Sequence, residues 1–255
     1  MNIMKNLLII IILLFAVQVI GQEIKSYDFN LYIDVRSKSI LVEGNMEADF
    51  NGNDSILLIL WGNSEIHSVE INNKKTSFFR DTTSPSKNMY IPGGKNLIIY
   101  KPNKAKSPVE INIKYSCNFK DLNGWAKSFS DDWIELAFYS GWFPVHEASR
   151  NFTSKLKIQI DEGYKINGSG LIEKKDGCWT INQPWPSFDM VVVASKDLKY
   201  KTLEEKNAKI ELVYKDYNEP DVDSTLNECT FVINLFEKKF GKLDSVYSKR
   251  SICRI

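Results

Sequence analysis

The sequence predicts an all-β protein: an antiparallel sandwich or saddle-shaped β domain, followed by a short C-terminal α segment. Three observations indicate this fold class. Apolar and polar residues alternate in many short stretches, as in strands that bury one face. Gly, Asn, Asp and Pro separate these stretches at short intervals, which is typical of antiparallel β proteins. A helical period occurs only after residues 218–220 (Asn-Glu-Pro), so the α segment is confined to the end of the chain.

The predicted β domain begins with a hairpin. Residues 27–35 and 40–50 alternate in hydrophobicity on either side of a polar turn at 36–39. Residues 56–61 are apolar on both faces and predict a central strand. Further short strands are expected along the rest of the domain, at 66–71, 89–91, 97–100, 109–115, 156–160, 171–172, 178–181, 190–194 and 210–214.

The α segment is predicted from a helical spacing of apolar residues. Asp223 or Ser224 is the expected N-cap, and Gly241 stands where a helix usually ends. A stripe of apolar residues follows the cap at intervals of three or four, which places on one face Leu226, Cys229, Ile233, Phe236 and Phe240. We expect residues 223–255 to be poorly supported alone, because this face needs a partner.

Three segments are predicted from these patterns: a signal peptide at 1–21, a β domain at 22–217, and a different unit at 218–255. Lys5, the apolar run 7–17 and a small residue at Gly21 resemble a secretory signal. An uncleaved anchor is the alternative. We therefore expect a secreted or periplasmic protein that leaves the membrane after signal cleavage. The formal net charge of +1, with both signs mixed, argues against binding to nucleic acid.

Four cysteines allow three disulfide pairings in an exported chain, and the sequence does not choose among them. Buried free thiols are an equal expectation, because a core of this size does not depend on cross-links. No C-x-x-C spacing is present, which argues against a zinc knuckle or a redox pair. The four residues are Cys117, Cys178, Cys229 and Cys253.

A metal or catalytic centre is not expected within this chain. The stretch from His146 to Arg150 has a His and a Glu at the start of a zinc-helix pattern, but Arg150 occupies the position of the second His and cannot bind zinc. His67 is the only other histidine. No cofactor is expected, and no Ser-His-Asp order, Gly-rich phosphate loop or EF-hand spacing occurs.

One stretch, 133–170, resembles a known family. An aromatic–Pro pair, Phe143-Pro144, is followed by a Gly163-Tyr164 turn and an Asn167-Gly168 turn. This order is similar to the N-terminal β domain of the gluzincin zinc aminopeptidases of the alanyl aminopeptidase type. The resemblance extends weakly over 27–255. It departs from the family at 148–150 (Ala-Ser-Arg), where Glu-Pro is usual, and no Gln lies between Tyr115 and Phe143.

The resemblance implies a non-catalytic β domain of an exported aminopeptidase-like zinc metallopeptidase. The family's G-x-M-E-N loop and H-E-x-x-H helix would lie beyond Ile255, so peptide hydrolysis and zinc are expected only in a full-length form. The chain alone is predicted to be inactive. Its implied partner is the catalytic domain, contacted through Leu226, Ile233 and Phe236.

Three residues are predicted to bind substrate: Glu135, Trp142 and Glu147. Glu135 is closest to the position where many family members place a Gln for the peptide's amino terminus, and Glu147 replaces a family Asp. The alternative is that both carboxylates are solvated strand ends and that the tryptophans are core residues. An alternative function is a stand-alone secreted β-sandwich that binds peptide or glycan through the Trp142 loop. A degenerate full-length relative acting as a scaffold is a third possibility.

Overall fold

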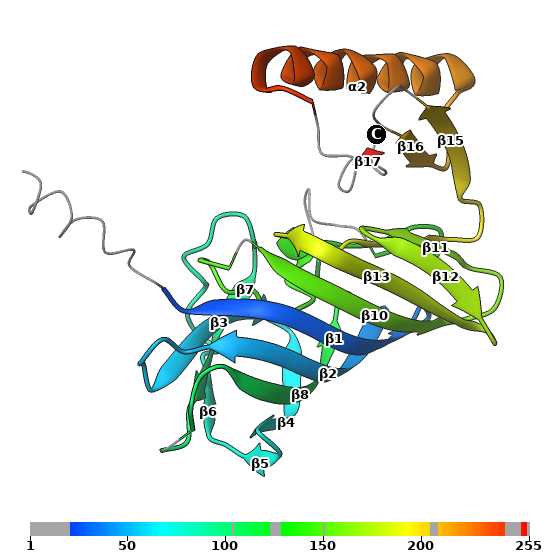
Figure 1. Ribbon diagram of the computed structural model, residues 1–255. Helices are drawn as coiled ribbons and strands as arrows, with labels where there is room; N and C mark the ends of the chain where they lie inside the picture. Colours follow the sequence, from blue (N-terminus) through cyan, green and yellow to red (C-terminus); the bar gives the residue numbers. More distant parts are fainter. Residues whose placement is uncertain are drawn as a thin grey trace, which may run out of the picture.

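The computed structural model describes residues 21–103, 105–122, 129–149, 151–204, 209–242 and 251–253. The predicted signal peptide at 1–21 lies outside this part except for Gly21. Strands dominate the described residues, and one long helix follows them (Figure 1). The prediction of an all-β domain with a C-terminal α segment is confirmed. No helix within the described ranges is long and apolar enough to cross a bilayer.

The strands of the described residues fall into one large sheet and three small ones. The large sheet has the order β12-β13-β10-β1-β2-β8-β4-β5, and the small ones have the orders β3-β7-β6, β11-β14-β9 and β15-β16-β17. The bounds are Glu23–Asp34 (β1), Ser39–Asp49 (β2), Ser55–Trp61 (β3), Ser64–Ile71 (β4), Lys74–Lys75 (β5), Phe78–Arg80 (β6), Gly94–Tyr100 (β7), Val109–Asn118 (β8), Ile134–Leu136 (β9), Phe152–Ile160 (β10), Lys165–Gly168 (β11), Leu171–Lys175 (β12), Cys178–Ser187 (β13), Val192–Ser195 (β14), Lys199–Glu204 (β15), Lys209–Tyr214 (β16) and Ser251–Cys253 (β17).

The large sheet buries one face through a consistent register. Phe29 of β1 pairs with Gly44 of β2 and with Leu156 of β10, and Gly44 pairs in turn with Ile113 of β8. Because side chains alternate along a strand, this register directs one apolar set into the core and the polar set outward. The predicted hairpin is confirmed as β1–β2. The β1–β10 contact is parallel, so the sheet is mixed rather than wholly antiparallel.

Strand β3 is an edge strand of a three-stranded sheet, and the prediction of a central strand at 56–61 is wrong. Its run of apolar residues has another cause. The loop at 141–145 covers the open edge. The amide of Ile59 donates to the carbonyl of Val145 at 2.8 Å, and the amide of Val145 donates to the carbonyl of Ile59 at the same distance. The amide of Trp61 donates to the carbonyl of Gly141 at 2.8 Å. The strand is therefore enclosed although only one strand pairs with it.

Strand β13 extends beyond its predicted end at 181 to Ser187. Pro184 and Pro186 in this extension lack an amide hydrogen and argue against a central strand. The pairing with β10 is irregular there, with a register shift between Phe152 and Ser154, so the prolines occupy a position where ladder bonds are already interrupted. Residues Asn167-Gly168, expected as a turn, are the end of β11.

The helix α2 (Glu219–Phe240) begins earlier than predicted. Asn218, rather than Asp223 or Ser224, is the N-cap: its side-chain oxygen accepts a 3.0 Å bond from the amide of Asp221. Pro220 suits the first turn, where no helical amide bond is required. Val222 and Leu226 are buried against β16. Strand β16, against which the helix packs, also contacts the β11-β14-β9 sheet: the side-chain amide of Asn167 on β11 donates to the carboxylate of Glu211 on β16 at 3.1 Å.

The centre of the main core is the loop that carries Trp142. The Phe143 ring makes edge-to-face contacts with Tyr27, Trp142 and Phe152, with centroids 5.3–6.0 Å apart. Backbone carbonyls of this loop are also bonded: Tyr115 donates its hydroxyl to Trp142 at 2.9 Å, and Tyr27 donates to the carbonyl of Pro144 at 2.7 Å. The loop is thus fixed between the large sheet and β3.

Candidate functional site

The strongest candidate site is a cavity of about 360 Å³ next to β9. It lies among β9, the short helix η2 (Phe138–Ser140), the turn 168–170, β13 and the bend 187–191. Thirteen residues line it, and two of them are acidic while none is basic: Glu135, Ala137, Tyr139, Gly168, Ser169, Gly170, Gln183, Trp185, Ser187, Phe188, Asp189, Val191 and Val193. Its volume falls in the range of pockets that hold small ligands.

Glu135 is positioned by β9, where it pairs with Val193 of β14. Only 6% of the residue is exposed. Its carboxylate accepts hydrogen bonds from the Tyr139 hydroxyl, one turn further along the chain, and from Trp133 Nε1 at 3.3 Å. Two donors from aromatic side chains therefore orient this carboxylate at the wall of the cavity.

Asp189 is the second carboxylate of the cavity. Its Oδ1 accepts a 2.8 Å bond from the amide of Phe138, at the start of η2, and so connects the 187–191 bend to the segment after β9. Burial raises the pKa of Asp189 to about 7, with a further rise from the charge of Glu135 and an opposing contribution from the amides of Phe138 and Met190. The cavity thus keeps two acidic groups close enough to interact electrostatically.

Gln183 is the most buried polar side chain in the cavity wall. It is 0% exposed, and neither its amide nitrogen nor its amide oxygen has a hydrogen-bond partner. Leaving buried polar atoms unpaired costs free energy, and native structures contain few such groups. The Gln183 amide therefore keeps unused hydrogen-bonding capacity in the wall of the cavity.

The remaining wall combines close-packed backbone with aromatic rings. Position 168 requires glycine because the backbone of Val191 lies so close that a Cβ there would be 2.2 Å from its carbonyl oxygen. Trp185 is half-buried, and Phe188 is largely exposed with its ring edge-to-face with Phe138 at 5.9 Å. Apolar surface beside carboxylates suits a ligand with both a cation and hydrocarbon.

The structure separates the three predicted substrate-binding residues. Glu135 lines the cavity. The side chain of Trp142 is 0% exposed, packs against Phe143, and donates Nε1 to the carbonyl of Met190 at 3.1 Å. The indole of Trp142 is therefore a core side chain. If the chain were a stand-alone binding module, it would have to bind its ligand through a surface other than this indole. Glu147 is exposed and does not line the cavity.

The described residues do not fit a zinc ion. Neither histidine lies in a group of three or more potential ligands, and no such group occurs in the described ranges. His67 Nε2 lies 3.1 Å from Ser116 Oγ, and His146 Nδ1 lies 3.1 Å from Ser149 Oγ. Burial lowers the pKa of His146. Arg150 lies outside the described part.

Three cysteines are described with their side chains, Cys117, Cys178 and Cys229, and the first two are free thiols. Cys117 is buried in β8, and burial raises the pKa of its thiol far above the usual range. The side chain of Cys253 lies outside the described part. No disulfide connects the three described side chains.

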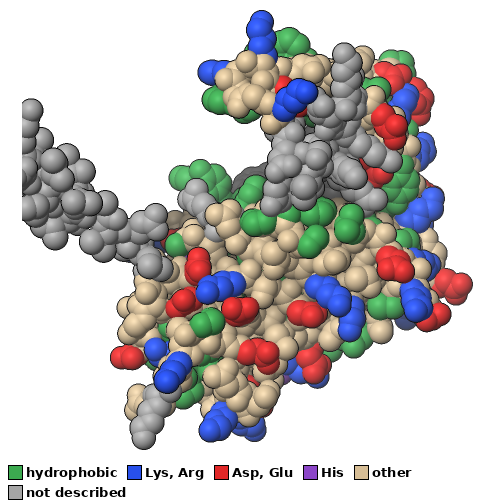
Figure 2. Space-filling model, in the orientation of Figure 1, with side chains coloured by type: hydrophobic (Ala, Val, Ile, Leu, Met, Phe, Trp, Pro, Cys, Tyr) green, Lys and Arg blue, Asp and Glu red, His purple; other side chains and the backbone are tan. Residues whose placement is uncertain are grey.

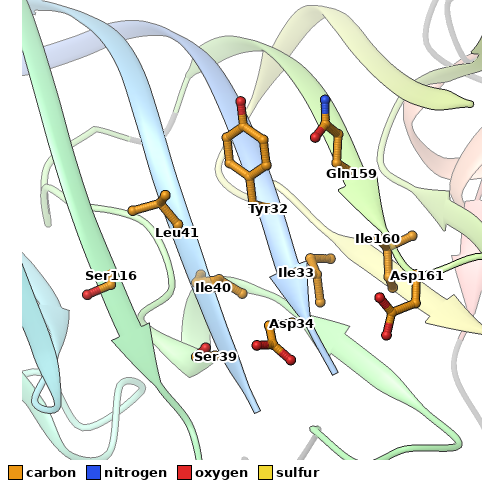
Figure 3. A pocket seen from close by; sticks show the side chains of 10 residues that line it. All are labelled: Tyr32, Ile33, Asp34, Ser39, Ile40, Leu41, Ser116, Gln159, Ile160 and Asp161. Atoms are coloured by element: carbon orange, nitrogen blue, oxygen red, sulfur yellow. The ribbon is translucent and has the colours of Figure 1, made fainter. Parts of the chain in front are cut away.

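Two other hollows lie on the large sheet and are weaker candidates. One, of about 430 Å³, follows the ends of β1, β2, β8 and β10; Figure 3 shows its side chains spread along neighbouring strands, with Asp34 beside Ser39. Asp34 accepts a 3.0 Å bond from the amide of Ser37 and so caps a turn. The other is polar and contains the exposed Lys114–Glu43 ion pair at 2.9 Å. Neither holds an unpartnered buried group.

Comparison with known proteins gives a match in structure only. No family model matches the chain, and no curated protein matches it by sequence. An M1 zinc metallopeptidase from Deinococcus radiodurans matches with a TM-score of 0.57 and 11% identity, over 78% of this chain and 48% of that one. A mutant of an M1 zinc metallopeptidase from the same organism, with Tyr-Ser-Ala bound, matches with a TM-score of 0.61 and 12% identity, over 91% and 56%.

The native leukotriene A4 hydrolase of Saccharomyces cerevisiae matches with a TM-score of 0.63 and 15% identity, over 92% of this chain and 38% of that one. The fold is that of the M1 zinc metallopeptidases. The predicted resemblance to zinc aminopeptidases is therefore confirmed at the level of the fold. The M1-like chain spans about half or less of the length of these relatives.

Sequence reasoning missed two residues of the cavity, Gln183 and Asp189. Gln183 lies before two prolines and Asp189 lies in the bend after them, so both were expected in a loop between strands. A signal was present: the acidic residue directly precedes the apolar run 190–194, where a buried carboxylate is unusual. They line the same cavity as Glu135, although the three residues come from β9, β13 and the 187–191 bend.

Proposed function

We propose that this chain is the non-catalytic β domain of an exported aminopeptidase-like zinc metallopeptidase. The observation that supports the proposal is the M1-like fold together with a cavity beside Glu135, the residue assigned to the peptide's amino terminus by the family resemblance. Zinc and the hydrolytic step would belong to a catalytic domain with its own ligands, because the described residues do not provide a metal site.

In this proposal, Glu135 receives the protonated amino terminus of a peptide. Its carboxylate is fixed by Tyr139 and Trp133, so little reorientation is needed when a cation approaches. Val193 and Ala137 contribute apolar surface to the wall of the cavity. The chain thus supplies positioning of the substrate, and the reaction takes place on residues of the catalytic domain.

The exposed side of α2 is the proposed contact with that catalytic domain. Phe236 is 52% exposed, and further exposed apolar residues lie beside it: Phe231, Val232, Leu235 and Phe240. Ile233 is partly buried against the chain's own sheet. Leu226, which was predicted to contact the partner, is buried against β16 and is removed from the proposed contact.

Two assays test the proposal. With zinc and alanine p-nitroanilide, the purified chain should release no product; turnover that a chelator abolishes would contradict the non-catalytic role. In calorimetry, L-alanine amide should bind and its N-acetyl derivative should not, because acetylation removes the cation that Glu135 recognises. Glu135→Gln should abolish this difference, whereas Asp197→Asn, an exposed acid outside the cavity, should preserve it.

Export is tested separately. The culture medium or periplasmic fraction should contain a chain that begins at Gln22, as determined by N-terminal sequencing. Recovery of a chain that still begins at Met1 from the membrane fraction would instead support the uncleaved anchor.

A further inference from the structure

We propose that the outer face of the β3-β7-β6 sheet binds the surface of a bilayer that contains anionic phospholipids, so that the processed chain stays attached to a membrane peripherally. The proposal replaces the expectation that the chain leaves the membrane after signal cleavage. It goes beyond the proposed peptidase function and rests on different residues. We call this surface the β6 face and define it by Leu57, Phe79, Ile98 and Tyr100.

The β6 face is an apolar row that crosses three strands. Ile98 of β7 is paired with Leu57 of β3 on one side and with Phe79 of β6 on the other. Side chains at paired positions lie on the same side of a sheet, and so does that of Tyr100, two residues after Ile98. Leu57 is 46% exposed and Phe79 is 53% exposed, whereas Leu58, at an alternate position, is fully buried. One side of this sheet therefore belongs to the core, and the other presents apolar side chains to the surroundings.

The segment that supplies most of this face is strongly basic. Residues 72–108 contain one acidic residue, Asp81, and eight basic residues: Lys74, Lys75, Arg80, Lys87, Lys95, Lys101, Lys104 and Lys106. The formal net charge of the whole chain is only +1, so the rest of the chain is acidic on balance. The charge of the whole chain thus conceals one segment that attracts anionic surfaces.

Exposed lysines of this segment are the groups that an anionic surface would meet. They are Lys74, Lys75, Lys87 and Lys106. None of the ion pairs among the described residues includes them. Arg80, in contrast, has a structural role, because its guanidinium donates to the carbonyls of Lys95 and Trp61 at 2.6 Å each.

Two backbone contacts place basic residues at the edge of the β6 face. The hydroxyl of Thr76 donates to the carbonyl of Tyr100 at 2.6 Å, and the amide of Tyr100 donates to the carbonyl of Ser77 at 3.1 Å. Lys75 directly precedes Thr76, and Lys101 directly follows Tyr100. Aromatic rings suit the boundary between headgroups and acyl chains, and lysines next to them suit the phosphates of anionic lipids.

A lipid surface fits the β6 face better than nucleic acid or a second copy of the chain. Bases stack on aromatic rings, whereas Leu57 and Ile98 supply aliphatic surface. Two copies joined through this face would bring their lysines together, and like charges repel one another. A bilayer with anionic lipids offers both apolar depth and negative charge. Figure 1 shows β6 at the end of the β domain away from α2, so α2 would remain accessible.

The start of the processed chain also lies beside the β6 face. The side chain of Gln22 donates to the carbonyl of Ser55, and Ser55 is paired with Tyr100. The predicted leader, with its apolar run at 7–17, directly precedes Gln22. A leader held in a membrane would therefore bring this face close to the lipid surface before cleavage.

Vesicle co-sedimentation of a chain that begins at Gln22 tests the proposal without the leader. We expect vesicles with about 30% phosphatidylglycerol in phosphatidylcholine to bind at least about tenfold more tightly than phosphatidylcholine alone. Raising NaCl from about 0.05 to about 0.5 M should weaken this binding at least about fivefold, because salt screens exposed charges.

A lysine pair locates the electrostatic part of the contact. Lys74→Gln/Lys75→Gln should weaken binding to the anionic vesicles at least about fivefold. The matched control, Lys155→Gln/Lys157→Gln, removes two exposed lysines of β10 and should bind within about twofold of the wild type. Both variants should unfold at the urea concentration of the wild type, because all four side chains are exposed.

One apolar side chain locates the rest of the contact. Phe79→Ser should weaken binding to the anionic vesicles at least about threefold, because less apolar surface enters the bilayer. Leu171→Ser, on β12, is the matched control, since Leu171 is also 53% exposed, and should leave binding unchanged.

The other outcomes would overturn the proposal. Equal binding to both kinds of vesicle, no binding to either, or equal losses in the control variants would exclude the β6 face as an anionic lipid site. Tighter binding of a short DNA duplex would favour nucleic acid, and a dimer that Phe79→Ser dissociates would favour a second copy. Binding of L-alanine amide should be the same in all four variants, because the β6 face and the Glu135 cavity share no residue. The failure of one proposal is thus distinguished from the failure of the other.

Discussion

The Trp142 loop and the Glu135 cavity are close in sequence. They differ in how many of their buried polar atoms have hydrogen-bond partners. In the loop, Trp142 and Phe143 are fully buried, and the indole nitrogen and the Trp142 carbonyl both have partners. In the cavity, Gln183 has two unpaired polar atoms and Asp189 has a strongly raised pKa. The first region is arranged for stability, and the second retains unfavourable groups that a ligand can satisfy.

The distribution of charge also differs between the molecular surface and the cavity. Figure 2 shows acidic and basic side chains mixed over one face of the β domain, without a large patch of one sign. The cavity, in contrast, has two acids and no base among its lining residues. A nearly neutral chain thus concentrates charge of one sign at one small, partly enclosed place, where electrostatic interactions are strongest.

The largest expected effect is on the Trp142 loop. Phe143→Ala removes a fully buried ring from contacts with Tyr27, Trp142 and Phe152, and should lower the free energy of unfolding by about 3–5 kcal/mol. Phe188→Ala is the control on the cavity side and should cost less than about 1 kcal/mol, because Phe188 is largely exposed. Urea denaturation checks both; similar losses would invalidate the contrast.

The second effect is a pH dependence of stability that originates in the cavity. Because the pKa of Asp189 is about 7 in the folded chain and near 3.8 when unfolded, the unfolded chain releases this proton first as the pH rises. The contribution of Asp189 to stability is therefore present below about pH 4 and is lost by about pH 8, with a change on the order of 4 kcal/mol.

Asp189→Asn should abolish this part of the pH dependence. As the pH rises from 4.5 to 8, the urea concentration at the midpoint of unfolding should rise for the variant relative to the wild type, because Asn does not ionise. Glu135, the other acid of the cavity, is unchanged in both proteins. Parallel pH profiles for the two proteins would show that Asp189 has an ordinary pKa.

A third effect compares a buried with an exposed apolar side chain of α2. Leu226→Ala should cost about 2–3 kcal/mol because Leu226 is buried against β16, whereas Phe236→Ala should change stability by less than about 0.5 kcal/mol. Thermal unfolding of both variants checks the prediction. An equal loss from Phe236→Ala would mean that the exposed face of α2 is already covered within this chain.

The smallest effect has the opposite sign. Gln183→Met should raise the free energy of unfolding by about 1 kcal/mol, because it removes buried polar atoms that have no partner. Gln159→Met, on the exposed face of β10, is the matched control and should be neutral within about 0.5 kcal/mol. A destabilised Gln183→Met protein would indicate that the amide is paired in solution.

The sequence predicts the elements of this fold better than their contacts. The β1–β2 hairpin was found because its alternation is local, and α2 was found because its apolar spacing is local, although its N-cap was misplaced. The parallel β1–β10 pairing joins Tyr27 to Ser154, and no local pattern indicates it. Pro184 and Pro186 concealed the end of β13, since proline usually argues against a paired strand.

Glu135 was assigned to substrate binding through a family resemblance, which carries information that residue periodicity does not. The structure places it in the wall of a cavity, and its binding role stays a prediction. For Trp142 the sequence left both a binding role and a core role open, because a tryptophan in a loop can have either, and its complete burial favours the core role. Gln183 and Asp189 meet Glu135 through three separate elements, so their chemistry becomes visible only when those elements are packed together.

Indole amide resonances in a two-dimensional ¹H–¹⁵N NMR spectrum test the central claim most directly, because Trp185 lines the cavity while Trp142 lies in the core. Trp→Phe variants assign the two signals. On titration with L-alanine amide, the Trp185 signal should shift with saturation and the Trp142 signal should remain in place. An unchanged Trp185 signal, or a shift confined to Trp142, would contradict a ligand site beside Glu135.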